Sequence, residues 1–167
     1  MKRQLVLSVV FLFVIGASEL IGAQEEAGTS SAQVRIRSVR AIPQVYVALQ
    51  LSASDQQLFV PYCGESEGTK FLCTVAAHLE IASQHGWRAA KHNTESGVLG
   101  GVSLENAVGI TFERGKEGVF TFQFSPSFFE VRSGQRLRII IDAWPDEQSM
   151  KRDHAVLHLV SPPFVCP

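Results

Sequence analysis

The chain has 167 residues, of which 46% are hydrophobic and 19% are charged, and its formal net charge at pH 7 is -1. This length supports one domain with a real hydrophobic core. The nearly neutral charge provides no general electrostatic attraction to nucleic acid or to an anionic membrane surface, so neither is expected as a partner.

The first 23 residues have the anatomy of a secretory signal peptide. A short cationic start precedes an apolar run of thirteen residues, from Leu5 to Ala17. This run is shorter than the roughly 20 residues that cross a bilayer, and small residues ending at Ala23 provide a cleavage site. We therefore predict cleavage after Ala23, a secreted or periplasmic location, and a mature chain without a membrane span. The alternative is an uncleaved anchor.

Beyond the signal peptide, the hydrophobic pattern has a period of two. Residues 24–33 are small and polar and predict a flexible leader. Apolar and polar residues then alternate, which is typical of strands with one face toward a core and one toward water. The strongest alternation covers Val45–Leu51, Val108–Glu113, Phe120–Phe124 and Leu137–Ala143. Weaker alternation covers Val34–Arg40, Leu58–Tyr62, Phe71–Ser83, Trp87–Lys91 and Ala155–Ser161.

These short strands, separated by turns with Gly or Pro, predict the fold class. We expect an all-β, antiparallel two-sheet β-sandwich of immunoglobulin-like type, which forms a single domain over residues 34–167.

Two cysteines, Cys63 and Cys73, lie ten positions apart around a polar turn with Gly68 at its centre. If the flanking strands form a hairpin, the two side chains fall opposite each other, at a distance that suits a disulfide. The spacing does not fit a zinc site, and no Cys-x-x-Cys redox motif is present. We therefore predict a structural disulfide. Cys166 is left over, and it either pairs between two chains to form a dimer, replaces one of the other cysteines, or stays free.

The outward positions of the strand Leu137–Ala143 and its flanks indicate an interaction surface. Arg136, Arg138, Ile140 and Trp144 alternate with the core positions and are expected on one outer face. Arg and aromatic side chains are enriched at the centres of protein interfaces, so this set is a candidate interface. The alternatives are a solvated face, on which Arg stems cover apolar surface, or a second buried layer.

The C-terminal region holds weak candidates for a metal site, namely Met150, His154 and His158. Exported copper proteins combine His, Cys and Met ligands, but here Cys166 follows the histidines instead of clustering with them. No metal or other cofactor is therefore expected. The sequence also lacks a Gly-x-Ser-x-Gly elbow and a phosphate-binding loop, so it contains no positive sign of an enzyme.

A series of short motifs resembles one group of known domains. PYCG at 61–64, GW at 86–87, a Phe-x-Phe strand at 120–124 and GQRLRI at 134–139 follow one another in the chain. This order is similar to small immunoglobulin-like sandwich domains of exported bacterial proteins, and more loosely to the BsuPI-type proteinase inhibitors. The resemblance implies the fold over about residues 34–161, and an inhibitor of this kind would use a rigid loop, for which Ser96–Glu105 is the candidate.

The first functional expectation is an exported, non-enzymatic module that binds a protein or cell-envelope component through a sheet face or a loop. The alternatives are an inhibitor or accessory factor of a secreted protease, and a periplasmic copper carrier.

Overall fold

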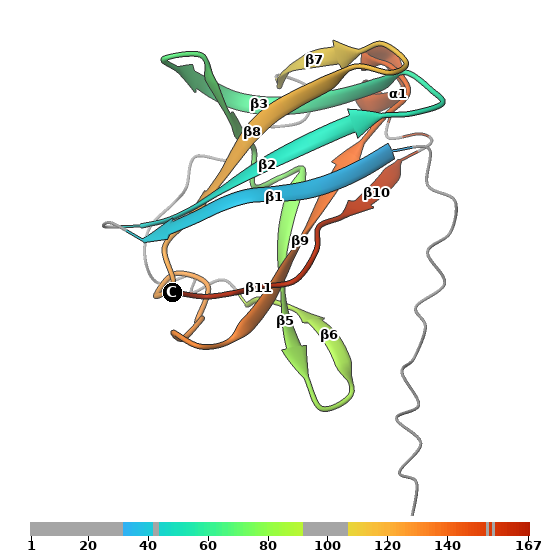
Figure 1. Ribbon diagram of the computed structural model, residues 1–167. Helices are drawn as coiled ribbons and strands as arrows, with labels where there is room; N and C mark the ends of the chain where they lie inside the picture. Colours follow the sequence, from blue (N-terminus) through green and yellow to red (C-terminus); the bar gives the residue numbers. More distant parts are fainter. Residues whose placement is uncertain (1–31, 42–43, 92–106, 153, 155) are drawn as a thin grey trace, which may run out of the picture.

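The computed structural model describes residues 32–41, 44–91, 107–152, 154 and 156–167, and strands form most of them (Figure 1). The first sheet, sheet A, contains in spatial order β1 (Ala32–Ala41), β2 (Val45–Ala53), β8 (Glu117–Phe124), β4 (Thr69–Leu72), β3 (Leu58–Ser66) and β7 (Val108–Phe112). The second, sheet B, contains β10 (Leu157–Val160), β9 (Arg136–Ala143), β5 (Ala77–Ser83) and β6 (Gly86–Ala89), with β11 (Phe164–Val165) paired to β9. Within the described residues, no helix is long and apolar enough to span a bilayer.

The two sheets pack around one hydrophobic core, as the period of two predicts. On β2, the odd-numbered residues from Val45 to Ala53 are buried and the even-numbered ones are half-buried. On β9, the odd-numbered residues from Leu137 to Ala143 are buried in the same cluster. Burial of one such aliphatic side chain contributes about 1.5 to 3 kcal/mol. The two sheets confirm the all-β class. The burial patterns show that the alternation correctly assigns the inward faces of these strands.

Sheet A is mixed, which corrects the prediction of purely antiparallel pairing. Strand β4 runs parallel to β8, with Lys70 beside Phe120 and Phe71 beside Thr121. The predicted single strand Phe71–Ser83 is divided by a turn after Leu72, so β4 stays in sheet A and β5 pairs with β9 in sheet B. Because one edge of β4 already pairs with β3, only its other edge is open to β8. Alternation predicts the face of a strand on which a side chain lies, but it does not predict which strands pair with each other.

A second, smaller apolar cluster surrounds Trp144, which is only 1% exposed. The prediction that Trp144 lies on an exposed face is therefore wrong. Its backbone pairs with Phe59 on β3, and the short helix α1 (Glu147–Lys151) packs Met150 into the same cluster. The carboxylate of Asp146 caps this helix by accepting a hydrogen bond of 2.7 Å from the Ser149 amide. Neither α1 nor β11 was predicted from the sequence.

Strand β1 begins at Ala32, two residues before the predicted start of the domain. The predicted signal peptide and most of the leader, residues 1–31, lie outside the described residues. The same holds for the predicted loop Ser96–Glu105.

Candidate functional site

The predicted disulfide between Cys63 and Cys73 is present, and it holds the base of the β3–β4 hairpin. The two Cα atoms are 5.0 Å apart. The cysteines are not directly opposite each other, however. A register shift between Tyr62 and Gly64 makes Cys63 the extra residue of a β-bulge. The disulfide therefore ties the irregular part of the hairpin, and the tip of this hairpin forms one end of the groove described next.

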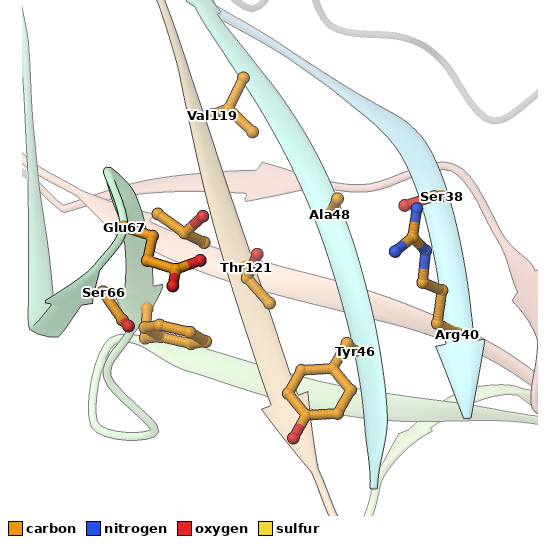
Figure 2. Close-up of a pocket in the computed structure, with 10 residues that line it drawn as sticks. Ser38, Arg40, Tyr46, Ala48, Ser66, Glu67, Val119 and Thr121 are labelled. Carbon is orange, nitrogen blue, oxygen red and sulfur yellow. The ribbon is translucent and has the colours of Figure 1, made fainter. Parts of the chain in front are cut away.

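The outer face of sheet A carries a groove that crosses the strands, with a volume of about 650 Å³ (Figure 2). Its floor is a row of side chains aligned by the strand register. Ser38 on β1 lies beside Ala48 on β2, Ala48 lies beside Thr121 on β8, and Thr121 lies beside Phe71 on β4. Three of these four side chains are small. Larger side chains in the neighbouring rows therefore stand above them, and a trough remains.

One wall of the groove is the row that contains Tyr46. Arg40 and Gln123 lie beside Tyr46 on the two neighbouring strands. The amide of Gln123 donates to the side-chain oxygen of Gln44 and lies 3.5 Å from the Tyr46 hydroxyl. On the other side, Val119 is 42% exposed and lies beside Gln50. The groove is thus bordered by an aromatic ring beside a hydrogen-bonded amide, and by an exposed apolar side chain.

A β-bulge in β1 turns the side chain of Ser38 into this groove. Ile36 pairs with Leu49 and Ser38 pairs with Ala48, so Arg37 has no counterpart on β2. A regular strand would place residue 37 beside Ala48 instead. The extra residue reverses the alternation, which brings Ser38 into the groove lining and leaves Val39 packed against the core. Bulges commonly redirect side chains in this way beside functional sites.

The far end of the groove is the tip of the β3–β4 hairpin. Ser66 pairs with Thr69, so only Glu67 and Gly68 form the turn, with φ angles of 50° and 77°. Positive φ at both positions is the signature of a type I′ turn, where Asn, Asp and Gly are preferred because they tolerate it best. Glu67 is therefore in a strained conformation that costs roughly 1 kcal/mol or more. Its side chain lines the groove.

Charges of opposite sign stand at the two ends of the groove (Figure 2). Arg40 on β1 and Glu67 at the hairpin tip are both exposed. Among the described residues, neither forms an ion pair within 4.0 Å, whereas Lys70, Arg138 and Lys151 each pair with a glutamate. Both groups are thus available to a charged ligand.

Three of the four predicted interface residues share the outer face of sheet B, away from the groove. Arg138 donates to Glu80 at 2.6 Å and stacks 4.6 Å from the centre of the Trp87 ring. Ile140 is half-buried beside Val160, and Arg136 is exposed. Trp87, which comes from β6, takes the place on this face that was predicted for the buried Trp144.

The predicted metal candidates are not brought together. Met150 is buried beside Trp144, whereas His154 and His158 are exposed. No group of three or more His, Cys, Asp or Glu side chains within the described parts of the chain could hold a metal ion. Cys166 is a free cysteine in the main core, and burial raises the pKa of its thiol. A bridge from Cys166 to a second chain would therefore require the C-terminal segment to leave the core.

His158 instead joins a polar cluster on sheet B. The carboxylate of Asp142 lies 2.7 Å from His158 Nδ1 and 3.0 Å from His78 Nε2, so it bridges β10 and β5. The hydrogen bond to Asp142 raises the pKa of His78, against the opposing effect of burial. Burial by itself raises the pKa of Asp142, but the hydrogen bonds to His78 and His158 and the charges of the two rings outweigh it, so this pKa is lowered.

The groove residues were not found by sequence reasoning. Ser38, Ala48 and Thr121 carry no catalytic or ligand-binding motif. Ala48 and Thr121 occupy ordinary outward positions, whereas Ser38 has the parity of the inward residues Val34 and Ile36 and lines the groove only because of the bulge at Arg37. The only signal was the small size of the side chains at these positions. That signal has meaning only once the register between β1, β2 and β8 is known. Comparison with protein-family models finds no match to this chain, and comparison with curated proteins finds none either.

Proposed function

We propose that the protein is an exported, non-enzymatic module of immunoglobulin-like sandwich type, and that it binds a segment of a partner protein in the groove of sheet A. The Cys63–Cys73 disulfide supports export, because disulfides persist in oxidising compartments. Two sheets around one core support the sandwich class, together with the resemblance to exported bacterial domains.

The observation that carries the proposal is the groove itself. Its volume of about 650 Å³ lies within the range of 300 to 1,000 Å³ that is typical of ligand sites. It combines an apolar floor at Ala48, two aromatic rings, several hydroxyl groups and two charges of opposite sign. A polypeptide segment offers a complement to each of these, since it carries apolar side chains, main-chain polar groups and both kinds of charge.

A fixed floor favours binding without rearrangement. The backbones of β2 and β8 pair with neighbours on both sides, so the sheet beneath the groove is rigid. The disulfide restrains the hairpin that forms the far end. A preformed site loses less conformational entropy on binding, which leaves more of the contact energy for affinity.

The test is to fill the groove at its floor. In Ala48→Trp, a large ring replaces the smallest side chain of the row, and Ser52→Trp adds the same ring at an outward position of β2 that does not line the groove. The exported protein is immobilised and offered the secreted and envelope proteins of its source. We expect capture and chemical cross-linking of a partner by the wild type and by Ser52→Trp, and at least a tenfold loss with Ala48→Trp.

Thermal unfolding shows that both variants are folded before they are compared. Equal capture by the two variants, or equal loss with both still folded, would exclude the groove as the site. The outer face of sheet B, with Arg136, Arg138 and Ile140, remains the alternative surface for a partner. Neither a protease inhibitor nor a copper carrier has a supporting feature in the described residues.

A further inference from the structure

The geometry points to the chemistry of the segment: an extended polypeptide with one acidic and one basic side chain about four residues apart, and an apolar side chain between them. This inference rests on the proposed function and specifies its ligand. The acidic side chain of the ligand lies toward Arg40, and the basic one toward Glu67.

The spacing follows from the strand order. Three steps between neighbouring strands separate β1, which carries Arg40, from β4, which begins beside the turn at Glu67. At about 4.8 Å a step, this distance is roughly 14 Å. An extended chain advances about 3.3 Å per residue, so about four residues cover it. Arg40 lies one row away from this floor, beside Tyr46, and Glu67 lies in the turn before β4. Figure 2 shows the Arg40 side chain extending toward Ser38 and the Glu67 side chain pointing toward Thr121. A segment lying along the row Ser38–Ala48–Thr121–Phe71 therefore passes both charges.

Side chains, and not strand addition, must recognise this segment. Under the groove, the backbone groups of β2 and β8 are directed to their neighbours in the sheet, so no free strand edge is offered there. The hydroxyl groups of Ser38, Thr121 and Thr69 instead line the groove and can bond to the main chain of the ligand. The space above Ala48 accepts an apolar side chain between the Tyr46 and Phe71 rings.

The strain at Glu67 is an independent observation on the same point. A turn with two positive φ angles is most stable with Asn, Asp or Gly at the first position, yet a longer carboxylate stands there. Its side chain is exposed, has no ion-pair partner among the described residues, and lines the groove. Strained residues of this kind are concentrated at ligand-binding positions.

Selection from a random peptide library tests the inference, with the exported protein as bait and four versions compared. The wild type should enrich peptides with one acidic and one basic residue about four positions apart. Arg40→Glu makes both ends acidic and should enrich peptides with two basic residues. Glu67→Lys makes both ends basic and should enrich peptides with two acidic residues. This design does not depend on the direction in which a peptide lies in the groove.

Arg88→Glu is the matched control, because Arg88 is an exposed residue of β6 in the other sheet and does not line the groove. It carries the same change of charge and should select the wild-type peptides. For one selected peptide, removal of either groove charge should weaken binding about two- to fivefold, the range for an exposed ion pair. Added salt should weaken binding by the wild type as well.

The outcomes separate the ligand chemistry from the proposed function. If all four versions select the same peptides, and Ala48→Trp still abolishes binding, the charge inference is overturned while the groove remains the site. If no peptide is selected and a neutral oligosaccharide binds in an Ala48-dependent way, the ligand is not a polypeptide. If neither class binds, the proposed function fails too.

Discussion

The disulfide between Cys63 and Cys73 provides the most direct test of how the hairpin beside the groove is stabilised. In the double variant Cys63→Ser/Cys73→Ala, the bridge is lost, and alanine at position 73 avoids placing a hydroxyl group in a site that is 0% exposed. The bridge closes a ring of about 11 residues, since the sequence separation is 10. The loop-entropy relation then gives about 3 kcal/mol at 25 °C. This is a large part of the 5 to 15 kcal/mol that stabilises an ordinary domain.

Urea unfolding of the oxidised wild type and of the double variant measures this difference. We expect the variant to lose about 2 to 4 kcal/mol of unfolding free energy, and the wild type in excess reductant to lose a similar amount. Thiol titration of the oxidised wild type should find one reactive group after denaturation and none before, because Cys166 is buried. A loss below about 1 kcal/mol, or three free thiols, would refute the assigned role of the bridge.

Three further predictions follow from packing, protonation and strain. In Gly118→Ala, the new Cβ would lie 2.1 Å from the buried ring of Phe112, so we expect a loss of roughly 1 to 3 kcal/mol, whereas Gly64→Ala meets nothing within 4 Å and should change stability by less than about 0.5 kcal/mol. Because the pKa of His78 is raised above 6.5, its stabilising contribution is complete below pH 6.5 and is lost as pH rises through the folded-state pKa. The lowered pKa of Asp142 protects the same contacts from acid, since its contribution is present above its ordinary value of 3.8 and is lost only as pH falls through the lower folded-state pKa. Both rings are half exposed or more, so the decline on the alkaline side should be roughly 0.2 to 1 kcal/mol, and a pH series of urea unfolding that shows the same decline in His78→Gln would contradict this assignment. Glu67→Asn relieves the strained turn and should stabilise the fold by about 0.5 to 1 kcal/mol while it weakens ligand binding two- to fivefold; stabilisation with unchanged binding would remove Glu67 from the site.

The features that follow from the sequence are those that depend on a single strand or hairpin. Alternation in Val45–Leu51 and Leu137–Ala143 identifies the buried positions, because each strand needs one apolar face against a core. The spacing of Cys63 and Cys73 around Gly68 identifies the hairpin and its bridge, because all the interacting residues are close in the chain.

Patterns along the sequence do not predict features that depend on segments far apart in the chain. Trp144 has the parity of an outward residue, but Phe59 and α1 cover it. The run Phe71–Ser83 has continuous strand character, but the chain leaves sheet A within it. The groove depends on the register of β1, β2, β8 and β4, and on a bulge at Arg37 that no local pattern indicates. Sites built from a cross-strand row of small side chains are therefore recognisable only in the folded chain.

The most direct measurement is a map of amide chemical shifts in NMR spectra recorded with and without a peptide selected by the wild type. If the groove of sheet A is the binding site, the changes should centre on the row Ser38, Ala48, Thr121 and Phe71 and extend to Glu67. Changes confined to the outer face of sheet B, around Arg138, Ile140 and Val160, would contradict the assignment and move the binding site to the opposite sheet.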